Sequence, residues 1–248
     1  MLNNTDFTLS IEDLTVSFDG FKAVDGLNLY LDKNELHVVI GPNGAGKTTV
    51  LDLICGKTKS TDGSIKFLGQ ELTKMAEHEI VRAGVGRKFQ TPSIYENLSV
   101  LDNLVISYPF GRGVFGSLMF KRTKQVMDKV HETAREIMLD DSLETEAGLL
   151  SHGQKQWLEI GMLLIQDPQL LMLDEPVAGM SVKERELTAN LLNKICEGRS
   201  VLVIEHDMEF VERIADKVTV LHQGKILAAG KMQDVQSDPK VIEVYLGH

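Results

Sequence analysis

The stretch LHVVIGPNGAGKTTVLDLI, residues 36–54, joins a short apolar run, a glycine-rich turn and a second apolar segment. Its turn matches the phosphate-binding pattern GxxxxGKS/T, which requires a strand before it and a helix after it. In such a turn successive backbone N–H groups face phosphate oxygens, and the helix N-terminus adds positive potential. The sequence therefore predicts a P-loop α/β core that binds a nucleoside triphosphate. The alternative, a tight strand-to-helix turn without a ligand, does not explain the complete motif.

The lysine and the hydroxyl residues of this turn have separate tasks in binding phosphate and metal. Lys47 is expected to neutralise the β- and γ-phosphates, and the Thr48 hydroxyl is expected to hold Mg²⁺. The residues of the turn that we expect at the nucleotide are Gly41, Pro42, Asn43, Gly44, Ala45, Gly46, Lys47, Thr48 and Thr49.

Composition excludes several classes of protein. The chain has 248 residues, and its 26 Lys and Arg against 36 Asp and Glu give a formal net charge of −10. This balance lacks the basic footprint of a nucleic-acid binder, so we expect no DNA or RNA partner. Cys55 and Cys196 lie far apart without metal-ligand spacing and are expected to be reduced thiols. The start MLNNTDFTLS has no signal-peptide pattern, and the apolar runs are too short to cross a bilayer, so we expect a soluble, cytoplasmic chain.

Two kinds of strand pattern indicate how the fold is organised. FTLSIEDLTVSF (7–18) and LNLYL (27–31) alternate apolar and polar residues, which predicts an N-terminal antiparallel β subdomain. LHVVI, LLML (170–173) and VLVIE (201–205) are continuous apolar runs, typical of parallel strands covered on both faces. KVTVLHQGKILAAG (217–230) is expected to form two strands around Gln223 and Gly224, with a helix over PKVIEVYL (239–246).

Between these strand regions the apolar residues follow helical spacing. TKQVMDKVHETAREIM (123–138) and GQKQWLEIGMLLI (153–165) both show this period. We therefore predict one domain over residues 1–248. Its α/β core comprises residues 1–91 and 167–248, and an inserted α-helical subdomain comprises residues 92–166.

Three side chains at strand ends are candidates for hydrolytic chemistry. Asp174 follows LLML and can bind Mg²⁺, and the adjacent Glu175 can orient and deprotonate an attacking water. His206 follows VLVIE and would reach the same edge of the sheet, where it could contact the γ-phosphate. Acidic residues after strands are also common turn formers, and a lone histidine at a strand end is usually structural. The phosphate loop favours hydrolysis, so we expect an enzyme that hydrolyses a nucleoside triphosphate.

A second glycine turn lies in LLSHGQKQWLEIG, residues 149–161. Ser151 is a natural N-cap, and Gly153 would let an anion approach the exposed N–H groups of the helix that follows. Taken alone, this turn would indicate only a capped surface helix.

LSHGQKQ, between the phosphate loop and LLMLDE, resembles the LSGGQ signature of ATP-binding cassette (ABC) ATPases, and the resemblance covers essentially the whole chain. It implies that Ser151, Gly153 and Gln154 bind the ATP held by a second cassette chain, identical or different. It also implies that Phe18 stacks on adenine with Val24 packed nearby, although Phe18 could be an ordinary sheet-face aromatic. Gln90 matches the Q-loop glutamine, which contacts Mg²⁺ during catalysis and responds to the membrane partner.

Two positions depart from the family pattern. His152 replaces the first signature glycine, and Ser181 stands where the D-loop usually carries Asp or Asn. Neither change removes a phosphate donor of the phosphate loop, but both put symmetric turnover at two sites in doubt.

The segments GRKFQTPSIYENLSVLDNL (86–104), VLVIEHDMEFV (201–211) and VYLG (244–247) resemble the ATPase subunits of branched-chain amino-acid-type importers. LSHGQKQWLEIGMLL (150–164) with DEPVAGM (174–180) is most similar to the urea and short-amide uptake ATPases. This resemblance implies a peripheral ATPase on the cytoplasmic side of the bacterial inner membrane, with permease subunits and, indirectly, a solute-binding protein as partners. The alternatives are the ATPase of a lipopolysaccharide-type exporter, a soluble ABC ATPase outside transport, and a P-loop kinase, which would not need LSHGQ.

Overall fold

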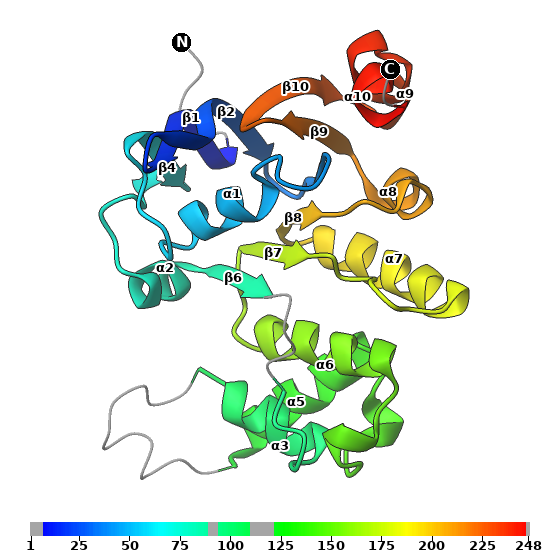
Figure 1. The fold of residues 1–248 in the computed structure, drawn as a ribbon. Coiled ribbons are helices and arrows are strands. Elements are labelled where there is room, and N and C mark those ends of the chain that lie inside the picture. Colours follow the sequence, from blue (N-terminus) through cyan, green and yellow to red (C-terminus); the bar gives the residue numbers. More distant parts are fainter. Residues whose placement is uncertain (1–6, 89–93, 110–121, 247–248) are drawn as a thin grey trace. The chain divides into compact units, whose positions relative to one another are not determined.

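The computed structural model describes residues 7–88, 94–109 and 122–246, and these divide between two compact units. The core unit comprises residues 1–87, 169–176 and 192–248, and the helical unit comprises residues 88–168 and 177–191. Residues 177–191 thus belong to the helical unit, whereas the sequence pattern led us to expect them in the core. Figure 1 shows the elements of both units in chain order.

The first sheet of the core unit is antiparallel, as predicted. Its strand order is β2-β1-β4-β5, with β1 and β2 forming a hairpin around Asp19 and Gly20. Both turn residues have positive φ, 49° and 89°, which Asp tolerates and glycine adopts freely. The strands are β1 (Phe7–Phe18), β2 (Phe21–Asp32), β4 (Asp62–Phe67) and β5 (Gln70–Glu71).

The second sheet has six strands in the order β10-β9-β3-β8-β7-β6. The pairs β7 with β8, β8 with β3, and β3 with β9 are parallel, and β10 closes the edge as an antiparallel hairpin with β9. All residues of β3, β7 and β8 are buried, which confirms that their apolar runs are central strands. The strands are β3 (Leu36–Ile40), β6 (Val85–Lys88), β7 (Leu170–Asp174), β8 (Ser200–Ile204), β9 (Lys217–His222) and β10 (Lys225–Gly230).

The helix α1 (Lys47–Ile54), labelled in Figure 1, shares one apolar core with side chains of both sheets. Its Val50, Leu51 and Ile54 join a buried cluster with side chains of β1, β2, β3, β7 and β8. Burial of this apolar area is the main stabilising term for the unit. The remaining helices of the core unit are α2 (Glu77–Ala83), α8 (Met208–Ile214), α9 (Met232–Ser237) and α10 (Pro239–Leu246), the last as expected from the sequence.

The helical unit contains the helices that the helical spacing predicted, α5 (Lys124–Glu136) and α6 (His152–Leu164). It also contains α3 (Val100–Ser107) and the first part of α7 (Val182–Cys196), which that spacing did not single out. Ser99, Thr123 and Ser151 cap α3, α5 and α6, because each side chain accepts a hydrogen bond from a backbone N–H of the first turn. No helix among the described residues is long and apolar enough to cross a membrane.

A buried hydroxyl links α6 to α7 inside the helical unit. The Trp157 indole N–H donates to Thr188 Oγ1 at 2.8 Å, and that hydroxyl donates to the Glu184 carbonyl oxygen, also at 2.8 Å. Thr188 is 0% exposed, so water cannot replace either bond. The start of α7 is therefore fixed against α6 by a hydrogen bond as well as by apolar packing.

Replacing this hydroxyl should destabilise the helical unit. Thr188→Val keeps the shape of the side chain but leaves the Trp157 N–H without its acceptor, at a cost of about 1–3 kcal/mol. A loss of this size lowers the melting temperature by roughly 2–4 °C for each kcal/mol. Thr188→Ser keeps the hydroxyl and is the matched control in differential scanning calorimetry. Equal losses in the two variants would contradict the assigned hydrogen bond.

Candidate functional site

The phosphate loop between β3 and α1 needs glycine at two positions because other backbone segments lie against it. At Gly41 a Cβ atom would lie 2.2 Å from the Leu221 carbonyl oxygen, and at Gly46 it would lie 2.6 Å from the Ala23 carbonyl oxygen. The φ angles are 153° and 100°, within or at the edge of the region that favours glycine. A larger residue at either position would push the loop away from its neighbours.

The turn between β9 and β10 fixes the other side of this loop. The Gly224 N–H donates to the Ala45 carbonyl oxygen at 3.0 Å, and the Gly224 carbonyl oxygen accepts from the Asp25 N–H at 2.9 Å. One glycine thus joins the loop to β2. Two other chain segments, residues 23–25 and 221–224, therefore determine the curvature of the loop, and with it the direction of its N–H groups.

Lys47 is held over its own loop. Its ammonium donates to the carbonyl oxygens of Gly41 at 2.8 Å and Pro42 at 3.1 Å. Partial burial lowers the pKa of Lys47, while the negative charges of Glu175 and Asp174 oppose that shift. An ammonium has three N–H donors, so it can bind both carbonyls and a phosphate oxygen at once.

Thr48 and Asp174 form a pair of oxygen ligands suited to Mg²⁺. The Thr48 hydroxyl donates to Asp174 Oδ2 at 3.2 Å, and Asp174, at the end of β7, is only 2% exposed. Mg²⁺ prefers hard oxygen ligands and usually completes its shell with water and substrate phosphates. The hydroxyl and the carboxylate, which we expected at the metal, are therefore of the kind that this ion prefers.

Glu175 and His206 come together just beyond the ends of β7 and β8. Glu175 Oε1 lies 3.4 Å from His206 Nδ1, and the Glu175 N–H donates to the Ile204 carbonyl oxygen at 2.9 Å. Glu175 has a φ of 48°, an uncommon conformation for a residue with a side chain and one that occurs often at functional sites. Two of the predicted catalytic side chains, Glu175 and His206, thus lie close to each other.

Glu205, which our interpretation of the sequence did not single out, binds the backbone of His206 and Asp207. It is 1% exposed, and its Oε2 accepts from the His206 N–H at 3.0 Å and from the Asp207 N–H at 3.4 Å. The sequence does contain a sign of this role, since Glu205 ends the buried apolar run VLVIE. An acid next to a buried strand is rarely buried itself unless its carboxylate is hydrogen-bonded.

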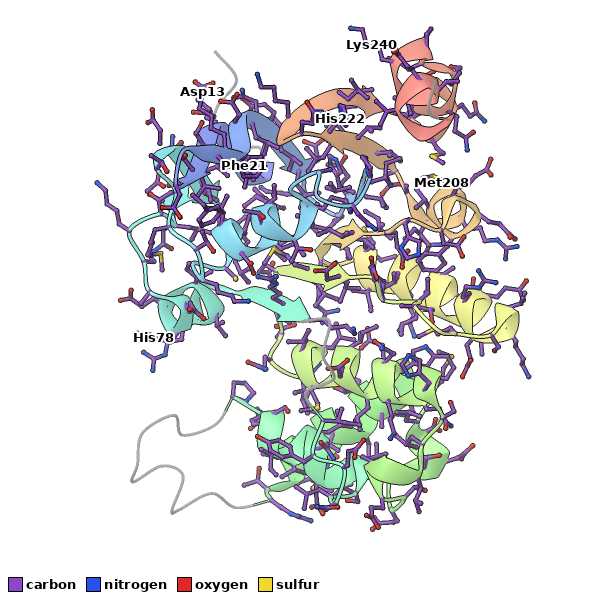
Figure 2. The ribbon with its side chains drawn as sticks, in the orientation of Figure 1. Asp13, Phe21, His78, Met208, His222 and Lys240 are labelled. Carbon is purple, nitrogen blue, oxygen red and sulfur yellow. The ribbon has the colours of Figure 1, made fainter. Side chains whose placement is uncertain are left out.

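The hairpin of β1 and β2 carries an exposed aromatic pair. Phe18 is 49% exposed and faces Phe21, 68% exposed, across the turn. Phe21, labelled in Figure 2, was not among the predicted residues. Val24 differs from the expectation: its side chain is 0% exposed in the core cluster, so it supports the hairpin and offers no surface to a base.

The second glycine turn begins α6 in the helical unit. The Ser151 hydroxyl accepts from the Gln154 N–H at 3.2 Å, and Gln154 Oε1 accepts from the Ser151 N–H at 2.9 Å, which forms a capping box. His152 Nε2 lies 2.9 Å from the Ala178 carbonyl oxygen. Gln90, the expected Q-loop residue, lies outside the described residues.

Comparison with known proteins identifies the family. A family described as ABC transporter matches residues 24–178, and one described as branched-chain amino acid ATP-binding cassette transporter matches residues 225–248. The chain belongs to the ABC transporter family. It is an ATP-binding subunit of the branched-chain amino acid type.

Relatives and solved structures cover nearly the whole chain. The high-affinity branched-chain amino acid transport ATP-binding protein BraF of Pseudomonas aeruginosa is 36% identical over 248 residues, covering 96% of this chain and 97% of that one. The probable branched-chain amino acid transport ATP-binding protein LivG of Archaeoglobus fulgidus is 34% identical, covering 96% and 95%. An ATP-binding cassette of an ABC transporter in its ADP conformation matches with a TM-score of 0.87 and 32% identity over 98% and 99% of the two chains.

Membership of this family gives the site its chemistry. The ABC subunit is an ATPase whose hydrolysis of ATP is coupled to transport, and it uses Mg²⁺. Subunits of the family work with a second ATP-binding subunit and with a membrane permease. The Thr48 and Asp174 oxygens would hold the magnesium ion, which neutralises phosphate charge when it is bound.

Removing the Lys47 ammonium should weaken nucleotide binding itself. Lys47→Ala deletes the main counter-ion of the β- and γ-phosphates, and charge-assisted bonds of this kind contribute about 1.5–3 kcal/mol, or roughly tenfold to a hundredfold in Kd. Calorimetric titration with MgATP measures the loss. Lys33→Ala, which removes an exposed lysine of the same unit, should leave Kd unchanged. An unaltered affinity in Lys47→Ala would contradict the assigned contact.

Proposed function

We propose that this subunit hydrolyses ATP to drive an importer of urea or short-chain amides through a separate permease. The observation that carries hydrolysis is the approach of Glu175 to His206, beside the pair of Asp174 and Thr48. Glu175 orients and deprotonates the attacking water, and His206 holds the Glu175 carboxylate and contacts the γ-phosphate. Lys47 and the loop N–H groups bind the phosphates that bear the developing charge.

The solute is argued from resemblance, because an ATPase subunit of this kind does not touch it. LSHGQKQWLEIGMLL and DEPVAGM resemble the urea and short-amide group, whereas the relatives named above are branched-chain amino acid transport ATP-binding proteins. Branched-chain amino acids are therefore the competing solutes. The subunit would bind its permease at the cytoplasmic face of the inner membrane, and a solute-binding protein would deliver the solute from the other side.

Ser151, Gly153 and Gln154 would act on a second nucleotide. In this arrangement the start of α6 binds the γ-phosphate of the ATP held by a partner cassette, through the Ser151 hydroxyl and the first N–H groups of the helix. Each ATP would then be bound by two chains, and ATP binding would favour their association. The partner is either a second copy of this chain or a related ATP-binding subunit.

The segment from Gln90 to Asn103 is the proposed contact for the permease. In its described part, buried Asn103 bonds both to the backbone N–H of Tyr95, at 2.8 Å, and to its carbonyl oxygen, at 3.0 Å. Tyr95 is 53% exposed despite this fixed backbone, and the Glu96 carboxylate next to it lies 3.0 Å from Lys155 Nζ. A rigid loop with an exposed ring and a charge suits a cytoplasmic helix of the permease.

Solute-stimulated ATP turnover tests the proposed function. The subunit is co-purified with its permease, reconstituted with the solute-binding protein, and assayed with urea, acetamide or leucine. We expect urea or the amide to raise the ATPase rate and leucine to leave it unchanged. Stimulation by leucine alone would overturn the solute assignment, and no response to any solute would favour the exporter alternative.

Glu175→Gln should separate binding from hydrolysis. The amide cannot take the proton of the attacking water, so the rate should fall by about 10²–10⁴-fold. The affinity for MgATP should change little, because Lys47 and Thr48 remain in place. Phosphate release measured beside an equilibrium titration checks both quantities, and turnover near the parent rate would exclude Glu175 as the base.

Reversing the charge of Glu96 should uncouple the subunit from its permease. Glu96→Lys alters the proposed contact without touching the phosphate loop, so transport should fall more than ATP affinity. Glu132→Lys, on the exposed side of α5, is a control with the same change of charge. Transport assays in vesicles measure the effect, and equal losses in both variants would refute a specific role for Glu96.

A further inference from the structure

One carboxylate in the helical unit spans the N-termini of two helices. Glu184 Oε2 accepts from the Ser181 N–H at 2.9 Å and from the Ser181 hydroxyl at 2.8 Å, at the start of α7. Its other oxygen, Oε1, accepts from the Ser151 hydroxyl at 3.0 Å, at the start of α6. The same side chain therefore completes the cap of its own helix and binds the cap residue of another.

The backbone of Gly153 also faces this carboxylate. A Cβ atom at Gly153 would lie 2.4 Å from Glu184 Oε1, so only glycine allows so close an approach. Hydrogen bonds from the Ser181 backbone and side chain, together with smaller contributions from Ser151 and the Gly153 backbone, hold the pKa of Glu184 below its ordinary value. The group bound between the two helices is thus an anion at neutral pH.

The donors that Glu184 binds at α6 are those that the proposed function gives to a phosphate. The Ser151 hydroxyl and the Gly153 N–H would both bind the γ-phosphate of the partner's ATP. A carboxylate and a phosphate are anions with acceptor oxygens only, so they cannot share the same two donors at the same time. Their like charges also repel each other across the few ångströms involved.

We propose that Glu184 is an internal competitor for the phosphate-binding end of α6, which must release its carboxylate before the partner's ATP can bind there. This inference rests on the proposed function, because it requires that Ser151 and Gly153 bind nucleotide in trans. Glu184 thereby sets the ATP concentration at which two cassettes associate. The contact stabilises the turn around Ser151 and Gly153 in the subunit that has no partner. It also opposes association of two cassettes before ATP is bound.

Ser181 is the residue that holds the competitor in place. Its N–H and hydroxyl bind Glu184 Oε2, and the hydroxyl also accepts from the Glu184 N–H at 3.3 Å, so the pair forms a capping box. Asp, one of the two residues usual in the family at this position, would cap α7 equally well but would place a second carboxylate against Glu184. The uncharged Ser181 side chain avoids this repulsion.

The ATP dependence of dimerisation tests this role in the full chain. All variants carry Glu175→Gln, so that ATP hydrolysis does not cause the dimer to dissociate. Sedimentation velocity gives the dimer fraction across a series of MgATP concentrations. Glu184→Gln keeps the size of the side chain but removes its charge, so the midpoint should fall about fivefold or more. Ser181→Asp should lower the midpoint as well, because it repels the Glu184 carboxylate from its place.

Two controls separate competition from a structural role. Glu197→Gln removes an exposed acid just after α7 and should leave the midpoint unchanged. ATP affinity of the monomer, titrated at high dilution, should be the same in all variants because the phosphate loop is intact. A midpoint that stays constant or rises in Glu184→Gln would overturn the proposal, whatever happens to the melting temperature.

The same experiment distinguishes this proposal from the function on which it rests. If the Glu175→Gln parent forms no ATP-dependent dimer, either alone or with the second ATP-binding subunit, the proposed binding in trans fails and the competition fails with it. If the parent dimerises with ATP and the Glu184→Gln midpoint does not fall, only the competition is refuted.

Discussion

The site depends on the close packing of the phosphate loop against the backbone of β2, of β9 and of the turn that follows β9. Gly41 lies against the Leu221 carbonyl oxygen, Gly46 lies against the Ala23 carbonyl oxygen, and Gly224 bonds to Ala45. A Cβ atom at Gly41, Gly46 or Gly224 would lie 2.2, 2.6 or 2.8 Å from a backbone carbonyl oxygen, so none of these glycines can be replaced without moving backbone. The loop is thus held in one shape before any phosphate arrives, and preorganisation of this kind reduces the cost of binding. Lys47, Thr48 and Asp174 take their positions from the same loop and the strands beside it.

Local patterns in the sequence predicted the parts of the site that follow directly from strands. The buried runs of β3, β7 and β8 end together at one edge of a parallel sheet, so Lys47, Asp174, Glu175 and His206 could be placed near one another from the sequence alone. The capped start of α6 was equally readable, because Ser151 and Gln154 stand three residues apart.

Contacts between distant segments could not be predicted in this way. The hydrogen bond of Gly224 to Ala45 joins the C-terminal and N-terminal segments of the core unit. Glu184 binds Ser151, which lies 33 positions earlier in the sequence. No periodicity encodes such pairs, since they depend on how helices and strands pack. Val24 was misjudged because it precedes the predicted strand 27–31, whereas β2 begins at Phe21 and buries the Val24 side chain against neighbouring elements.

The two glycine turns both lie at a helix N-terminus, which favours a negative charge, but they bind different groups in the structure. In the core unit the loop carbonyls bind Lys47, whose positive charge can pair with a phosphate. In the helical unit the start of α6 binds a carboxylate of its own chain. A helix N-terminus favours an anion in either case, so an end that is vacated by one anion is ready to accept another. The first turn is thus built to bind ATP directly, and the second to exchange an internal anion for an external one.

The most direct test of the account is whether one ATP is bound by two chains. In Glu175→Gln the account predicts that MgATP converts the monomer into a dimer, seen by size-exclusion chromatography, either alone or with the second ATP-binding subunit. Adding Ser151→Arg should abolish this dimer, because it places a bulky side chain at the start of α6, while MgATP affinity of the monomer stays the same. A dimer that persists in Ser151→Arg together with a lost monomer affinity would contradict the account.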